Sequence, residues 1–408
     1  MHLPALFARR YLVSKKSTQS INILSGISVL GMLVGSMGLI LVLSVFNGFE
    51  DLVLNLYNKF YPELIISPAK GKFFNEKTIH WDELNRVEGI NAYSMQLEEK
   101  ALLRYGDNQY IATVRGVDSN FTRVSSVQNS MFHGQFQLKN NNADFAIVGA
   151  GIEQALELNY DNPFNDLTIY IPKKGVSYVL NPEEAFNRQI IQPLGSFSIQ
   201  QEFDLEYVFV PLSFMRTLLN APEDVSAVSI SLKPGANIYS VKSALKKICG
   251  NNFEVLDRYE QNKTLYAVMR VEKWVVYAVL TFILIVAAFN IIGSLSMLII
   301  DKRKDINILR VMGADLPSIK RIFLYEGVLL SFIGCIFGFI FSVILILLQQ
   351  KFGFIEIGGG TFVVNSYPVK MQVMDFVLVF FTVMGIGIIA SWIPMMRKMN
   401  SPTRLSFE

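Results

Sequence analysis

Residues 274–300 read WVVYAVLTFILIVAAFNIIGSLSMLII and contain no charged side chain. About 20 apolar residues in a helix are enough to cross the roughly 30 Å hydrocarbon core of a bilayer. Three further uncharged stretches of similar length occur at residues 21–46, 327–350 and 376–396. A long segment of ordinary polar composition, residues 49–270, separates the first stretch from the second. The pattern therefore predicts an α-helical membrane protein with four transmembrane helices and a large domain between the first and the second.

The basic residues indicate how these helices are oriented. Four Lys and Arg residues lie within residues 9–16, six lie within 301–321, and three follow the fourth stretch. The short loop at 351–372 has only two. Short basic segments remain in the cytoplasm. We therefore expect both termini and the 301–321 loop to face the cytoplasm, and the large domain to lie on the outer side of the membrane.

These patterns divide the whole chain into segments. In chain order they are a cytoplasmic amphipathic N-terminal helix at 1–20, a first transmembrane helix at 21–48, an outer α+β domain at 49–271 with an inserted subdomain at about 119–200, a second transmembrane helix at 272–300, a cytoplasmic coupling-helix loop at 301–321, a third transmembrane helix at 322–350, a short outer loop at 351–373, a fourth transmembrane helix at 374–397 and a cytoplasmic tail at 398–408. A frayed basic tail is the alternative for the first segment. A cleaved signal peptide is the alternative for the second, but the apolar run is too long and residues 44–48 lack a small-x-small cleavage site.

The segment 49–270 has the composition of a folded domain of the α+β class. It contains 21 Lys and Arg against 26 Asp and Glu, so it is mildly acidic, whereas the whole chain has a net charge of +3. Residues 101–114 predict a hairpin that turns at Gly106. Residues 227–232 alternate as a half-buried strand does, and 240–248 place apolar side chains on one helical face. Only two cysteines are present, so the domain must fold on its own core without a disulfide framework.

Several chemistries have no support in the sequence. Glu326 and Asp375 lie at the edges of the uncharged stretches, where we expect them to be hydrated, so nothing marks an ion-coupled carrier. The three histidines have no metal-ligand spacing, and no Gly-x4-Gly-Lys-Ser/Thr loop is present to bind ATP. We therefore expect no cofactor, no metal, no catalytic site and no nucleic-acid partner.

The inner loop carries the most specific pattern. Residues 301–315 read DKRKDINILRVMGAD, in which Ile306, Leu309 and Met312, with Ile308 as a further candidate, form an apolar stripe on a short helix. Gly313 suits a helix C-terminus, and Asp315 is a candidate N-cap for the helix that follows. A single short helix is marginal in water, so it needs a lipid surface or a protein groove. Glycine pairs at 31/35 and 334/338 have the spacing of close helix–helix contacts in membranes.

At this point the sequence resembles a known family. Residues 288–292, AFNII, and 301–314, DKRKDINILRVMGA, closely resemble the FtsX/MacB-type permeases of ABC transporters, and the LolC/LolE lipoprotein-releasing branch in particular. Further similar motifs, in the family's order, are FARRYL at 7–12, SVFNGFE at 44–50, YPV at 367–369 and, with its order altered, SPTRL at 401–405. The resemblance implies a MacB-like periplasmic domain and an FtsX-like permease domain.

The resemblance also implies partners and a mechanism. The chain would be a non-catalytic subunit that pairs with a second permease copy, alike or different, and with a LolD-like cytoplasmic ATPase. Motion of the ATPase would drive extrusion of a lipoprotein from the outer face of the inner membrane to a LolA-like periplasmic carrier. The residues expected to couple to the ATPase are Lys304, Asp305, Ile306, Leu309, Arg310, Met312, Gly313 and Ala314.

A hypothesis for the substrate places its acyl chains in a membrane groove. The expected lining residues are Leu39, Leu43, Phe46, Tyr277 and Leu280. Contact with membrane lipid or with another helix is the alternative role for each. FtsX-like signalling to a cell-wall hydrolase and MacB-like export of peptides or drugs are the alternative functions. The choice between a LolC-like and a LolE-like subunit stays open, with 159–193 as a candidate carrier-binding segment.

Overall fold

The computed structural model describes residues 19–140, 143–160, 166–173, 185–356 and 366–398. The predicted N-terminal helix and the C-terminal tail lie almost wholly outside these residues, as does much of the 159–193 segment. The chain divides into two compact units. We call the described residues of 19–52, 267–356 and 366–398 the membrane unit, and those of 53–266 the extramembrane unit.

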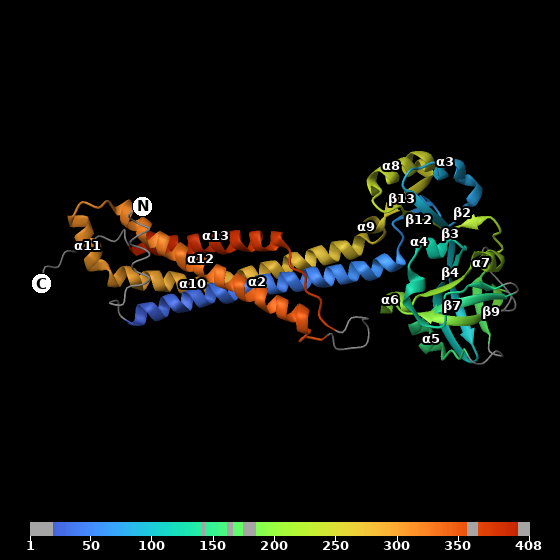
Figure 1. The fold of residues 1–408 in the computed structure, drawn as a ribbon, viewed down its shortest axis with the longest axis horizontal. Helices are drawn as coiled ribbons and strands as arrows, with labels where there is room; N and C mark the ends of the chain where they lie inside the picture. The colour runs from blue at the N-terminus through green and yellow to red at the C-terminus, as the bar shows by residue number, and fades with distance from the viewer. Residues whose placement is uncertain (1–18, 141–142, 161–165, 174–184, 357–365, 399–408) are drawn as a thin grey trace. The chain divides into compact units, whose positions relative to one another are not determined.

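Four long helices contain the predicted membrane spans (Figure 1). They are α2 (Gln19–Phe60), α10 (Lys263–Asp301), α12 (Leu316–Phe352) and α13 (Val373–Lys398). Each is long and apolar enough to cross a membrane. The helix α2 continues beyond Gly48 to Phe60, and no proline interrupts it there.

Glycines allow the membrane helices to pack closely. A Cβ added at Gly35 of α2 would lie 2.4 Å from Leu284 Cδ1 of α10. A Cβ at Gly334 of α12 would lie 2.9 Å from the Val29 carbonyl oxygen of α2. The prediction that both glycine pairs mark helix contacts is therefore confirmed.

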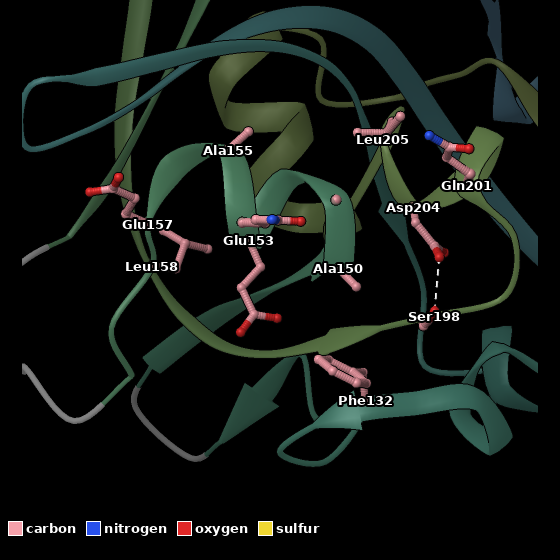
Figure 2. A pocket seen from close by; sticks show the side chains of 12 residues that line it. Phe132, Ala150, Glu153, Ala155, Glu157, Leu158, Ser198, Gln201, Asp204 and Leu205 are labelled. Atoms are coloured by element: carbon pink, nitrogen blue, oxygen red, sulfur yellow. Dashed lines mark hydrogen bonds between the residues drawn. The ribbon is translucent and has the colours of Figure 1, made fainter. Parts of the chain in front are cut away.

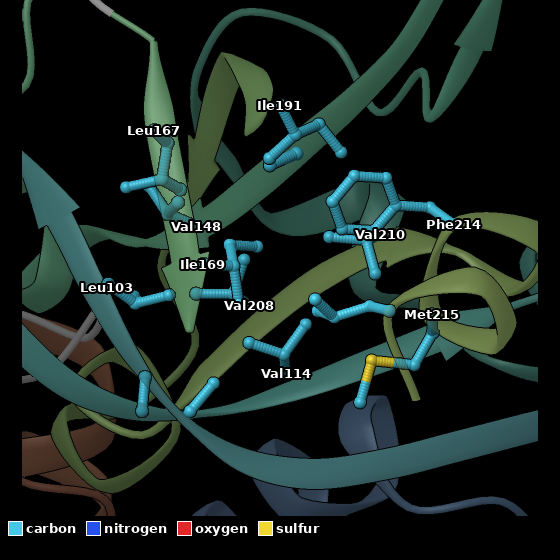
Figure 3. Close-up of a cluster of buried hydrophobic side chains, with 14 of the residues drawn as sticks. Leu103, Val114, Val148, Leu167, Ile169, Ile191, Val208, Val210, Phe214 and Met215 are labelled. Carbon is cyan, nitrogen blue, oxygen red and sulfur yellow. The ribbon is translucent and has the colours of Figure 1, made fainter. Parts of the chain in front are cut away.

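The extramembrane unit is built around a closed β-barrel. Its six strands are β3 (Ile90–Tyr105), β4 (Asn108–Val117), β7 (Ala143–Gly149), β8 (Leu167–Pro172), β9 (Phe186–Phe197) and β10 (Tyr207–Pro211). The strands pair in the order β3-β4-β10-β7-β9, and β8 pairs with both β9 and β3, which closes the ring. Side chains such as Leu103, Val114 and Ile169 fill the interior (Figure 3), so the barrel is a packed core.

The long strand β3 extends the sheet beyond the barrel. There it pairs with β12 (Ala227–Leu232), which is followed by β1 (Leu64–Pro68) and β13 (Phe253–Asp257). The helix α8 (Ile238–Cys249) packs on this part through Val241 and Leu245. The predicted hairpin at 101–114, strand at 227–232 and helix at 240–248 are confirmed, but the strand is buried along almost its whole length and not half-buried. Gly106 has the positive φ of 59° that the hairpin turn requires. Cys249 and Cys335 are both free.

Short elements connect the main ones. They are β2 (Phe74–Asn75), α3 (Trp81–Asn85), α4 (Phe121–Val124), β5 (Met131–His133), β6 (Lys139–Asn140), α5 (Ala150–Leu156), α6 (Gln201–Asp204), α7 (Leu212–Leu219), β11 (Asp224–Val225), α9 (Arg258–Gln261) and α11 (Arg303–Val311). The described strands of the subdomain expected at about 119–200 pair into the same sheet as β3 and β4, apart from the short β6 on β7. The subdomain boundary therefore stays a prediction.

Candidate functional site

The inner loop forms a helix with a well-defined end. The helix α11 is followed by Met312 and by Gly313, whose φ is +94°. The Ala314 amide donates to the Leu309 carbonyl over 2.9 Å, and the Gly313 amide donates to the Arg310 carbonyl over 3.0 Å. These two bonds define a Schellman motif, which fixes the direction in which the chain leaves the helix.

The chain enters α12 directly after this turn. Asp315 occupies the N-cap position with an extended backbone, as predicted, although its side chain makes no capping hydrogen bond. Proline in the first turn of α12 helps the helix to begin there. The link between α11 and α12 is therefore short and conformationally restricted.

The structure divides the predicted apolar stripe of α11 into two sets. Ile306 and Leu309 pack against the core of the membrane helices. Met312 is 77% exposed because α11 ends at Val311, so Met312 no longer follows the helical period. Val311, which is not among the predicted residues of the stripe, is 90% exposed, and Ile308 is 57% exposed.

Charged residues surround this exposed apolar set. Lys304 and Arg310 are exposed, whereas Lys302 lies 3.5 Å from Asp301 and 3.9 Å from Asp305. We call Ile308, Val311, Met312, Lys304 and Arg310 the coupling surface. It combines apolar area with positive charge, which suits a partner groove that is apolar and acidic. Val311 could have been predicted from the sequence, because it lies three residues after the apolar Ile308 and so on the same face of the helix.

One sequence expectation about the membrane helices is wrong. Glu326 was expected to be hydrated, but it lies more than two turns inside α12 and is only 3% exposed. Its Oε2 atom is buried without a hydrogen-bond partner among the described residues. Asp375 is also buried, at 8% exposure, because the side chain of Asn47 on α2 covers it. A one-dimensional pattern places a residue near a helix end but does not show which neighbouring helix covers it.

The structure separates the residues predicted to line a substrate groove. Leu39 and Leu43 are fully buried in the core between the membrane helices. Tyr277 is half-buried, and its hydroxyl is hydrogen-bonded to that of Thr382 on α13. Phe46 and Leu280 are likewise half-buried. In this conformation only Phe46, Tyr277 and Leu280 have surface to offer a ligand, and the groove stays a prediction.

The helix α10 exposes a broad apolar face. The exposed side chains on it are Val268, Val271, Trp274, Val275, Val279, Phe282, Ile283, Ile285, Val286, Phe289, Met297 and Ile300. An apolar surface of this extent needs lipid or another protein helix to cover it.

The extramembrane unit contains an open cavity beside α5 and α6 (Figure 2). Its volume is about 870 Å³, and Phe132, Glu153 and Asp204 are among its lining residues. Asp204 accepts hydrogen bonds from the Ser198 hydroxyl and the Ile199 amide, each over 2.9 Å. Burial nevertheless raises the pKa of Asp204 above its usual range. Two of the polar lining residues, Ser198 and Asp204, are therefore hydrogen-bonded to each other.

One of the three histidines, His133, lies at the surface. It ends β5 with a half-exposed side chain, and its Nδ1 lies 2.8 Å from Glu153 Oε1. Among the described residues, no group of three His, Cys, Asp or Glu side chains could hold a metal ion.

Comparison with known proteins identifies the class of protein. Residues 25–248 match the MacB-like periplasmic core domain, and residues 277–403 match the FtsX-like permease C-terminal domain. The chain therefore belongs to the FtsX/MacB-type permeases of ABC transporters, in which a MacB-like periplasmic core domain precedes an FtsX-like permease domain. The resemblance found in the sequence is confirmed.

Curated relatives extend over nearly the whole chain. The lipoprotein-releasing system transmembrane protein LolE of Haemophilus influenzae is 25% identical and covers 97% of both chains. The LolC protein of Xylella fastidiosa is 26% identical over 95% of this chain and 94% of its own. The LolC protein of Neisseria meningitidis is 23% identical over 97% of this chain and 96% of its own. The periplasmic region of MacB from Actinobacillus actinomycetemcomitans is a similar solved structure, with 12% identity, a TM-score of 0.37 and coverage of 53% of this chain and 98% of that chain.

Proposed function

We propose that this chain is the permease subunit of an ABC transporter that releases lipoproteins from the outer face of the bacterial inner membrane. Similarity to LolC and LolE proteins over almost their full length carries the proposal. Both termini and α11 then lie in the cytoplasm, and the extramembrane unit lies in the periplasm, as the basic loops favour.

The coupling surface on α11 is the proposed docking site for a separate LolD-like ATPase. The exposed side chains of Val311 and Met312 would enter a groove of the ATPase, and Lys304 and Arg310 would pair with acidic residues at its rim. Since Ile306 and Leu309 pack against the membrane helices, a push on α11 reaches those helices directly. Asp305, Gly313 and Ala314 shape the loop rather than bind the partner.

A motor is physically necessary for this reaction. Each buried methylene contributes about 0.8 kcal/mol to membrane binding, so extracting one acyl chain of about 15 methylenes costs about 12 kcal/mol. Spontaneous release is therefore negligible, and an apolar receiving surface such as a LolA-like carrier is required. ATP hydrolysis by the partner supplies the free energy, and this chain transmits it.

A second permease copy would complete the membrane part of the transporter. The exposed face of α10 is the proposed contact, since it is apolar and wide. Acyl chains would enter between the two copies near Phe46, Tyr277 and Leu280. Leu39 and Leu43 would join the groove only if the helices of one subunit move apart, because both are buried.

Reconstitution tests the proposed function. The chain is purified with its ATPase partner, placed in vesicles that contain a tri-acylated lipoprotein, and mixed with a periplasmic carrier protein. We expect ATP-dependent transfer of the lipoprotein to the carrier and no ATPase activity from the chain alone. Activation of a cell-wall hydrolase, or export of peptides or drugs, without lipoprotein transfer would replace this proposal with one of its two alternatives.

A further inference from the structure

A buried polar cluster joins three helices at one end of the membrane unit. The Lys273 ammonium on α10 donates to Asn47 Oδ1 on α2 over 2.6 Å. The Asn47 amide nitrogen donates to Asp375 Oδ2 on α13 over 2.5 Å. Lys273 Nζ and Asp375 Oδ1 are 4.0 Å apart. We call Asn47, Lys273 and Asp375 the clasp.

The chemistry of an amide explains why asparagine occupies the middle of the clasp. A carboxamide presents an acceptor and a donor on one planar group. Here the acceptor end meets a cation and the donor end meets an anion, so both interactions are charge-assisted. Asn47 is 1% exposed and Asp375 is 8% exposed, so the bond between them is shielded from water, whereas the Lys273 side chain is 29% exposed.

The segment before α13 reinforces the clasp. Asn47 Nδ2 also lies 3.4 Å from the Lys370 carbonyl oxygen, and the Lys370 amide donates to the Ser44 carbonyl over 2.9 Å. A Cβ on Gly48 would lie 2.3 Å from the Pro368 carbonyl oxygen, so glycine allows the backbone of this segment to touch α2. The part of α2 around Asn47 is therefore bonded to α10, to α13 and to the segment between α12 and α13.

We propose that Asn47 is a positioning residue that keeps α2, α10 and α13 together at this level as one body throughout the transport cycle. Force that enters through α11 is then transmitted along α2 and α10 together to the extramembrane unit. The helices do not separate, so the force is not dissipated between them. The geometric part stands on the contacts alone, whereas the need for Asn47 in coupling rests on the proposed function.

A distance measurement tests the geometric part. Spin labels replace the exposed Glu272 of α10 and Val373 of α13 in a Cys249→Ser, Cys335→Ala background, in the complete complex in lipid nanodiscs. We expect one narrow distance that is the same with and without ATP. Asn47→Leu should broaden it, whereas Asp51→Asn should not, since the Asp51–Lys370 pair is about half exposed. A distance that changes on ATP binding, or that stays narrow in Asn47→Leu, overturns the proposal.

A charge reversal tests the role of the amide in coupling. Lys273→Glu and Asp375→Lys should each lower lipoprotein released per ATP hydrolysed by about tenfold, since each leaves one end of the buried Asn47 amide facing a charge of the wrong sign. The double variant should recover most of this ratio, because the Asn47 amide can rotate to present its donor and acceptor to the exchanged charges. The recovery should vanish when Asn47→Leu is added. If the double variant releases as much lipoprotein per ATP with Asn47→Leu as without it, the coupling role is overturned. Absence of release from the native complex contradicts the proposed function, and the distance measurement still decides the geometric part.

Discussion

Arg258 Nε donates to the backbone carbonyl of Tyr61 over 3.1 Å. Tyr61 directly follows α2, and Arg258 Nη2 also reaches the Asn58 carbonyl in the last turn of that helix over 3.3 Å. A cation at this position satisfies carbonyls that have no partner within the helix and interacts favourably with the negative end of its dipole. Arg258 is the first residue of α9, so the end of α2 is bonded to the short helix that precedes α10.

Loss of this contact should destabilise the extramembrane unit. Arg258→Ala removes two hydrogen bonds from a charged donor, so we expect the free energy of unfolding to fall by about 1–3 kcal/mol. Denaturant unfolding of the purified chain measures the change. Lys72→Ala is the matched control, since the Lys72–Glu99 pair is exposed on the Lys72 side and should contribute less than about 1 kcal/mol. Equal effects from the two variants would contradict this account of Arg258.

The coupling surface should bind the ATPase through Val311. Val311→Glu places a carboxylate on a side chain that is 90% exposed, so the stability of the chain should not change. The variant should bind the ATPase at least about tenfold more weakly, because the added charge is buried when the partner covers it. Co-purification from detergent with the native ATPase measures this loss. Asn307→Glu, at another exposed position of α11, is the control for the added charge, and an equal loss there would mean that the contact is purely electrostatic.

The sequence could predict the features that depend on local composition. An uncharged run of sufficient length identifies a membrane helix wherever the helix packs, and all four were found. Gly313 and Gly106 could be placed at turns because each adopts a positive φ that other residues avoid. The position of the coupling loop followed from the same kind of signal. The sequence could not predict which residues of this loop are exposed, because the end of α11 at Val311 depends on the turn that follows.

Features that depend on pairing between distant segments could not be predicted. Arg115 is 6% exposed and lies with its guanidinium 4.8 Å from the Phe60 ring and 4.5 Å from the Tyr207 ring. Its ion pair with Glu98 joins neighbouring strands, but nothing in the spacing of these residues indicates that α2 ends there. The closure of the barrel by β8 and the clasp at Asn47 could not be predicted for the same reason. Both join segments that lie far apart in the sequence.

The stability of the extramembrane unit should depend on pH through Asp257. Burial tends to raise the pKa of this carboxyl, but hydrogen bonds from Lys242 and from the Glu260 backbone outweigh burial and lower it. A carboxyl with a lowered folded-state pKa stabilises the fold above its unfolded pKa, and this contribution is lost as the pH falls through the folded value. Asp257→Asn should therefore be less stable than the native chain at neutral pH, and the difference should shrink in acid. Urea unfolding between about pH 7 and pH 3 tests this sign, and a difference that grows in acid would reverse it.

The contact between α12 and α2 should require glycine at position 334. A Cβ at this position would lie 2.7 Å from Met32 Cβ and 2.9 Å from the Val29 carbonyl oxygen, and the latter belongs to backbone that cannot rotate away. Gly334→Ala should therefore force the helices apart and lower the stability of the purified chain by about 1–3 kcal/mol. Gly385→Ala is the matched control, because a Cβ there has no atom within 4 Å in the described part of the subunit. Alanine is the better helix former, so the control should be neutral or slightly stabilising. Thermal unfolding in detergent compares the two variants, and equal midpoints would mean that α2 and α12 do not pack through this glycine.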